Sequence, residues 1–290
     1  MGEKRSLRGA SLRPDAAQAH RDWRIPDELW ERIEPLLPPR TPHPLGCHRP
    51  RVDDRKAMEA IFFVLRTGCQ WNALNETKLC SSSSAQRRCQ EWTEADVFVA
   101  LWAQGLVEYD ALQGLAWEWL AMDGAMTQGP PLGGEKVGKN PTDRGKIGTK
   151  RSVLTDGHGV PIGLAVDGAN RHDFKLTRAT IASSAVERPD PTPEAPQGRC
   201  LAKGYDYDEV REWLTEFGFT AHIRARGEET QALKQEAGLK ARRWVVERTH
   251  SWMHRFRRVL IRWDKKVRND LGFLHLACAY ITYRQSGLLE

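Results

Sequence analysis

The hydrophobic pattern changes once along this chain, and that change limits the folds open to it. From Trp23 to about Leu106, apolar residues recur every three or four positions, as on helices that bury one face. After Leu115, short apolar runs alternate with Gly-rich turns and helical segments. We predict three strands, a helix, a strand, a helix, a strand and final helices, in that order. The fold class expected is α/β, preceded by a helical region.

The pattern divides the chain into three parts. Residues 1–22 are basic and lack an apolar core, so we expect a flexible basic arm and no signal peptide. Residues 23–112 are expected to form a helical domain whose short helices and tight turns suit a helix-turn-helix-like DNA-binding module. An ordinary helical bundle explains the same pattern equally well. Residues 113–290 carry the strands and are expected to form the second domain.

Positive charge is concentrated near the C-terminus. The net charge is 44 − 38 = +6, yet residues 242–268 alone hold ten Arg or Lys against Glu247 and Asp264. Trp and Phe are interleaved with these cations, which favours a polyanion such as nucleic acid as partner. Six scattered cysteines form no CxxC pair and indicate buried thiols in a reducing compartment. The longest apolar run, residues 60–65, is too short to span a membrane.

Two acidic residues, Asp123 and Glu247, are candidate metal-binding carboxylates. Asp123 closes the apolar run "WLAM" and is followed by Gly, as at the end of a strand. Glu247 lies on a predicted helix from about Ala241 to Trp263, on its polar, cationic face. For Glu247 alone, an exposed pairing with Arg243 is an equally physical explanation. Carboxylates of this kind can hold two Mg²⁺ ions for phosphodiester chemistry.

Several longer motifs carry a resemblance to a known family. They are "RTGCQWNAL", "MDGAMTQGPPLGGEKVG", "NPTDRGKIGTKRSVLTDGHGVPIGLAVDGANRHD", "KGYDYDEV" and "RRWVVERTHSWMHRFRRVLIRW". With these motifs the chain resembles the insertion-sequence-five-like transposases of the DDE superfamily, from about Trp23 to Arg284. The resemblance implies an RNase H-like catalytic domain. It also implies a bacterial, cytoplasmic and nucleoid-associated protein.

The resemblance places the family's three catalytic acids at Asp123, position 202 and Glu247, with Asp123 and Glu247 as metal ligands. Position 202, just before Lys-Gly-Tyr, is Ala202 here. Asp206 and Asp208 lie beyond that turn, and a shift of four residues would move a side chain by more than about 10 Å along a strand. We therefore expect the chain to be an inactive form that still binds DNA. The sequence leaves open whether Ala202 is engineered or natural.

The resemblance also implies two Mg²⁺ (or Mn²⁺) ions in the intact enzyme and double-stranded DNA as partner, both as terminal inverted repeats and as target. A homo-oligomer, at least a dimer on DNA, is expected because two ends must be joined. The residues predicted to contact DNA are Lys146, Lys150, Arg151, Arg243, Arg248, His254, Arg255, Arg257 and Arg258. Gln86, Arg87 and Arg88 are predicted to read bases from a recognition helix over residues 81–92.

Three other functions remain to be weighed. A DNA-binding regulator derived from a transposase would bind the repeats without catalysis. A nuclease of the same fold would cut DNA without needing paired ends. A sugar or nucleotide enzyme is disfavoured because Gly133 and Gly134 lack the spacing and the Lys-Ser/Thr ending of a phosphate-binding loop.

Overall fold

The computed structural model describes residues 23–39, 51–224 and 244–289. The helices are α2 (Asp27–Ile33), α3 (Asp54–Thr67), α4 (Ser82–Glu94), α5 (Val97–Gln113), α6 (Thr177–Ala182), α7 (Asp208–Glu216), α9 (Trp244–Met253), α10 (Arg257–Leu260) and α11 (Val267–Gln285). The strands are β1 (Trp119–Gln128), β2 (Gly138–Lys139), β3 (Ile147–Thr155), β4 (Pro161–Gly168), β5 (Gly198–Ala202) and β6 (Thr220–Arg224). Short 3-10 turns are η1 (Glu34–Leu36), η2 (Trp71–Glu76), η3 (Asp173–Leu176) and η4 (Lys203–Tyr205).

Helices α3 and α4 begin or end at residues whose chemistry suits a helix cap. The Asp53 carboxylate accepts a hydrogen bond from the backbone N–H of Lys56 (3.1 Å) at the start of α3. That helix ends at Gly68, whose φ of 69° lies in the left-handed region that glycine adopts without strain. The Ser81 hydroxyl accepts from the N–H of Ser84 (3.3 Å) at the start of α4.

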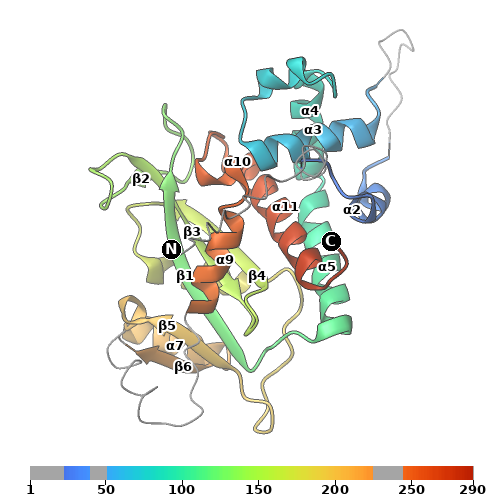
Figure 1. Cartoon of the computed structure of the whole chain (residues 1–290). Coiled ribbons are helices and arrows are strands. Elements are labelled where there is room, and N and C mark those ends of the chain that lie inside the picture. Colours follow the sequence, from blue (N-terminus) through green and yellow to red (C-terminus); the bar gives the residue numbers. More distant parts are fainter. Residues whose placement is uncertain (1–22, 40–50, 225–243, 290) are drawn as a thin grey trace, which may run out of the picture.

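The strands form one mixed sheet (Figure 1). Its main order is β4-β3-β1-β5-β6, with β2 pairing the first residues of β3 on the same edge as β4. β1, β3 and β4 are antiparallel neighbours, whereas β5 and β6 run parallel to β1. This is the topology of an RNase H-like sheet, so the α/β prediction is confirmed; the order of elements is as predicted except for the two-residue strand β2, which was not predicted.

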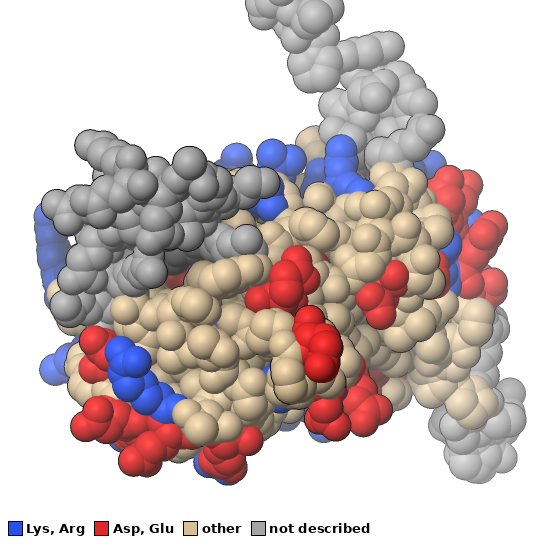
Figure 2. Space-filling model, turned by 90° about the horizontal axis from the view of Figure 1, so that it is seen from below, with Lys and Arg blue, Asp and Glu red and all other residues tan. Residues whose placement is uncertain are grey.

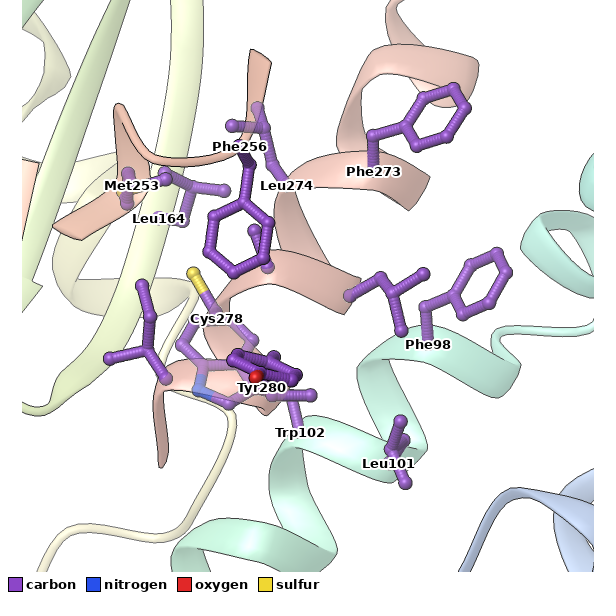
Figure 3. Packing of buried hydrophobic residues seen from close by; sticks show 14 of the residues in the cluster. Phe98, Leu101, Trp102, Leu164, Met253, Phe256, Phe273, Leu274, Cys278 and Tyr280 are labelled. Carbon is purple, nitrogen blue, oxygen red and sulfur yellow. The ribbon is translucent and has the colours of Figure 1, made fainter. Parts of the chain in front are cut away.

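Each face of the sheet is covered by different helices. Successive side chains of a strand point to opposite faces, so Asp123 and its pair Val153 face one side, and Gly124 and its pair Ser152 face the other. Helix α9 packs on β1 and β3, and α6 packs on β3 and β4. Figure 3 shows Leu164 of β4 beside Met253 of α9, which places α9 on the same side as the odd-numbered residues of β1.

Helix α11 joins the helical region to the sheet. It packs along α5, and its side chains Phe273, Leu274 and Cys278 lie in a continuous apolar core (Figure 3). Trp102 of α5 donates from Nε1 to the carbonyl of Pro161 at the start of β4 (2.9 Å). The division at residues 112 and 113 therefore stays a prediction, since the core of the described residues runs across it.

The prediction of one helix reaching Trp263 is wrong. Helix α9 ends at Met253, and the short α10 begins after Phe256, whose φ of −92° and ψ of 100° are extended. The chain then leaves helical geometry to meet the end of β1: Ile261 bridges Gln128, and the N–H of Arg262 donates to the Gln128 carbonyl (2.9 Å). Pairing with the sheet satisfies this backbone in place of helical bonds.

Candidate functional site

Two of the predicted acids lie on the same side of the sheet. Asp123 is half-buried in β1 on the face that α9 covers, and Glu247 is exposed in the first turn of α9. One turn further, the His250 ring nitrogen Nε2 lies 3.4 Å from the backbone carbonyl oxygen of Asp123. The helix that carries one carboxylate is thus tied to the strand that carries the other.

Position 202 lies beside Asp123 in the neighbouring strand. β1 and β5 are parallel, and Ala121 is in register with Cys200. The pairing ends there; continued for two more residues, the same register would set Asp123 level with residue 202. Adjacent strands lie about 4.8 Å apart, so this backbone position directly neighbours the strand of the first acid. The residue there is Ala202, and the described residues contain no group of three or more potential metal ligands.

Other acids near these strands have structural partners. Asp206 accepts from Nε and Nη2 of Arg211 (3.0 and 2.6 Å) beyond η4. Asp173 forms an ion pair with Nζ of Lys150 (3.0 Å) on the face of the sheet to which Gly124 belongs. Asp173 leaves no room for a side chain at Gly124, because an added Cβ would lie 2.2 Å from its Oδ1. Asp156 is fully buried and accepts backbone N–H bonds at the turn between β3 and β4, and burial raises its pKa.

The comparison with known families decides what this site belongs to. A model described as "Transposase DDE domain" matches residues 118–282, which include β1, β5 and α9. This chain is a member of the DDE transposase family. A second model, "Putative transposase of IS4/5 family", matches residues 25–102.

The chain is also similar to individual proteins. "Putative transposase for insertion sequence element IS402" of Burkholderia cepacia is 35% identical over 156 residues, covering 52% of this chain and 70% of that protein. "Insertion element IS402 uncharacterized 16.2 kDa protein" of the same organism is 34% identical over 119 residues, covering 40% and 80%. The solved "Mos1 mariner paired end complex with Mn" aligns with 95% of this chain and 94% of its own at 13% identity, with a TM-score of 0.28.

Three of the cations predicted to touch DNA are buried in this transposase. Arg151 is 2% exposed on the α9 face, and burial lowers its pKa. Lys150 is 6% exposed and donates to the Arg171 carbonyl (2.6 Å). Arg258 is 5% exposed and pairs with Asp264 (2.9 Å). The prediction of a surface contact is corrected for all three, because each side chain is buried.

The remaining predicted contacts have different surroundings. His254, Arg255 and Arg257 are exposed, as are Gln86 and Arg87 on α4. Lys146 is exposed and lies 3.3 Å from the Asp143 carboxylate. Arg88 was expected on the surface of α4, yet its side chain is 13% exposed and contacts Glu91 (2.5 Å). Arg243 lies outside the described residues.

A feature not predicted from the sequence is a stack of side chains along α9. The Arg248 guanidinium lies 4.7 Å from the ring centroids of both Trp244 and Trp252. The same guanidinium donates to the carbonyl of His158. The spacing of Arg248, four residues from each Trp, could have indicated this stack in the sequence, because residues four apart lie on the same face of a helix. Arg248 thus holds the two indoles in place, and its guanidinium is occupied by these contacts.

Burial also affects the two histidines near the acids. It lowers the pKa of His250 to about 4 and lowers that of His254 as well, with Arg151 acting in the same direction. A neutral His250 has one N–H donor, which matches its contact with the Asp123 carbonyl. The site therefore combines a half-buried carboxylate, an exposed carboxylate and neutral imidazoles.

Charge is unevenly distributed over the described surface. The face seen from below carries more Asp and Glu than Lys and Arg (Figure 2). The segment from Asp206 to Glu216 alone contributes five exposed acids. No described helix is long and apolar enough to cross a lipid bilayer.

Proposed function

We propose that the chain is a DNA transposase that binds the terminal inverted repeats of its insertion sequence. Its intact form would cleave and transfer DNA strands with Asp123, an acid at position 202 and Glu247. The observation that supports the proposal is the parallel pairing of β1 with β5 up to Ala121 and Cys200, two residues before Asp123 and position 202, together with the packing of the Glu247 helix on β1. Strand alternation would direct a carboxylate at position 202 to the same face as Asp123.

The donor set suits hard divalent cations. Carboxylate oxygens are the ligands that Mg²⁺ and Mn²⁺ prefer. Asp123 and Glu247 would hold the ions, together with an acid at position 202 in the intact enzyme. Such ions activate the attacking oxygen and stabilise the leaving oxygen in phosphodiester chemistry. Because Ala202 has no carboxylate, the site lacks one of the three acids. We propose that this chain therefore binds DNA without cutting it.

The chain's own residues would position the DNA. Arg255 and Arg257 are exposed around the end of α9 and would neutralise backbone phosphates, and the neutral imidazole of His254, also exposed, would donate a hydrogen bond to one. Gln86 and Arg87 are exposed on α4 and suit base readout in the major groove. His250 would keep the α9 turn that bears Glu247 at a set distance from β1. We also propose that at least two protomers act together on DNA, in the bacterial cytoplasm at the nucleoid.

The test is a paired assay on DNA that carries both ends of the element, with Mg²⁺. The chain and its Ala202→Asp variant are compared for binding and for strand cleavage. Binding by both, with cleavage by the variant alone, supports the proposal. Cleavage by the unaltered chain would show that another acid completes the site.

Ala202 itself favours a second candidate, a DNA-binding regulator descended from a transposase. Such a protein has no use for the missing carboxylate and would bind the repeats without catalysis. Binding by both forms with cleavage by neither would favour this regulator over the transposase.

A further inference from the structure

The connection between β1 and β2 carries a leucine that faces solvent. Leu132 lies in residues 129–134, "GPPLGG", and is 84% exposed. Among the large apolar side chains of the described residues it is the most exposed, and the next, Val107, is 62% exposed. Figure 1 shows that this connection projects beyond the end of the sheet. We call residues 129–134 the leucine turn.

The tip of the leucine turn is stiff. Pro130 and Pro131 have φ angles that are fixed by their rings. The N–H of Gly133 donates to the carbonyl of Pro130 (2.9 Å), which closes a β-turn that includes Leu132. Gly133 has a φ of 76°, in the left-handed region that glycine adopts without strain. Leu132 is therefore held in a defined place, and a contact made through it costs little ordering entropy.

Both ends of the leucine turn are anchored to the rest of the fold. The N–H of Gly129 donates to the carbonyl of Ile147 in β3, and the N–H of Glu135 donates to the carbonyl of Lys265, each at 2.9 Å. A Cβ added at Gly134 would lie 2.6 Å from the same Lys265 oxygen, so the two backbones are in close contact. The turn thus has a rigid base below its exposed tip.

Lysines surround the base of the leucine turn. Lys265, whose backbone contacts Gly134, is exposed, and so is its neighbour Lys266. Lys139 is also exposed and lies opposite Ile147, the residue that anchors the start of the turn. Within the described residues, none of these three lysines forms an ion pair with a carboxylate. Their charges are therefore available to an anionic partner.

The acid closest in sequence to the turn has another role. Glu135 accepts a hydrogen bond at Oε2 from the backbone N–H of Val267 (2.9 Å) at the start of α11. An apolar tip among unpaired cations suits duplex DNA, in which the lysines would meet phosphates and the tip would meet stacked bases. A purely apolar protein surface would leave the lysines without partners, so DNA is the favoured occupant.

We propose that the leucine turn is a wedge, which inserts Leu132 from the minor groove between two stacked base pairs of bound duplex DNA and kinks the duplex. The inference rests on the proposed function, because it adds a contact to DNA binding. An apolar side chain inserted in this way partly unstacks one base step and bends the duplex by about 20–90°. Steps that unstack easily, such as TA, would be preferred.

The test measures the bending of a duplex of about thirty base pairs that ends in the element's inverted repeat. Donor and acceptor dyes at its two ends report the end-to-end distance by energy transfer, and anisotropy gives the affinity of the full chain over a range of salt concentrations. The main variant is Leu132→Ala, at a position too exposed to affect the core. The matched control is Leu112→Ala, the same substitution at a leucine of α5 that is 56% exposed.

We expect the unaltered chain to bend the duplex and Leu132→Ala to remove at least half of that bend. Affinity should fall about threefold or more, with the slope of log K against log salt unchanged, because no phosphate contact is lost. Leu132→Met keeps a long apolar side chain and should bend the duplex as the unaltered chain does. Lys265→Gln should instead flatten the salt slope by about 0.9 and keep most of the bend. Leu112→Ala should change neither the bend nor the affinity.

An equal bend with Leu132→Ala, or the same loss of bend with Leu112→Ala or Leu132→Met, would overturn the inference and leave the proposed function standing. A duplex that stays straight when the unaltered chain binds it would overturn the inference as well. If the unaltered chain binds neither this duplex nor the paired ends, the proposed function itself fails. The two failures are therefore distinguishable.

Discussion

The imidazole of His250 lies 3.4 Å from the backbone carbonyl oxygen of Asp123, so a side chain of α9 touches the backbone of the residue that bears the first acid. Glu247 lies one turn before that contact. Because the imidazole is buried, its protonation would place an uncompensated charge between helix and sheet. The contact that positions the two acids is therefore sensitive to pH.

We predict a loss of stability in mild acid that depends on His250. Its pKa is lowered to about 4, against about 6.5 in an unfolded chain. The contribution of His250 to the free energy of unfolding is complete above the pKa of histidine in the unfolded chain. It is lost as the pH falls toward 4, by up to about 1.4 kcal/mol per pH unit. His275, lowered to about 4 by burial, adds to it. Urea midpoints from pH 7 to 4.5 measure the slope.

The control for this prediction is His250→Asn, which cannot take up a proton. Burial raises the pKa of Asp156 and Asp270, and these carboxyls lose stabilisation as pH rises, opposite to histidine. The difference between variant and parent isolates His250. Parallel pH curves for the two proteins would show that this imidazole does not contribute.

Arg257 and Arg258 are adjacent, yet we predict opposite effects. Arg258 pairs with Asp264 and is 5% exposed, so Arg258→Gln should lower the free energy of unfolding by about 3–5 kcal/mol. Arg257 is exposed, so Arg257→Gln should leave stability unchanged and weaken DNA binding with a shallower salt dependence. Melting curves and DNA titrations on both variants test the two predictions. If only Arg258→Gln weakened DNA binding, with its fold intact, Arg258 rather than Arg257 would be the DNA contact.

The contact between α11 and α4 has no room for a side chain at Gly272. An added Cβ would lie 2.3 Å from the hydroxyl oxygen of buried Thr93, which donates to the Cys89 carbonyl (2.7 Å). We predict that Gly272→Ala lowers the free energy of unfolding by about 1–3 kcal/mol despite the better helix propensity of alanine. Combining it with Thr93→Ala should recover part of the loss. Strictly additive losses in the double variant would contradict this packing.

Restoring position 202 gives the catalytic prediction. Ala202→Asp should give the chain Mg²⁺-dependent cleavage activity. Adding Asp123→Asn or Glu247→Gln should lower that activity at least about 100-fold, because losing a residue that only hydrogen-bonds a metal ligand already costs up to about 100-fold. DNA affinity should stay within about twofold in all of these variants. Full activity with Glu247→Gln would exclude that carboxylate from the site. Gel assays of cleavage and binding on the same samples give both readouts.

Local patterns in the sequence determined the elements of this protein and their order. Asp53, Gly68 and Ser81 lie at helix ends and act within one turn, and every strand except the two-residue β2 coincides with an apolar run beside a turn. The family motifs made Asp123 and Glu247 candidate acids and drew attention to Ala202, the position predicted for a third acid. Such features are readable in sequence because their causes lie within a few residues.

Tertiary structure alone decided which cations face solvent and where the last basic segment stops being a helix. Lys150, Arg151 and Arg258 read as surface charges in the sequence, but the fold buries all three, with Lys150 paired to Asp173 and Arg258 to Asp264. The helix predicted to reach Trp263 breaks because Ile261 and Arg262 meet Gln128 of β1. A pocket also forms between α3 and α11, which lie more than two hundred residues apart in the chain. Contacts between elements far apart in the chain leave no periodic signal, so folding alone brings these residues together.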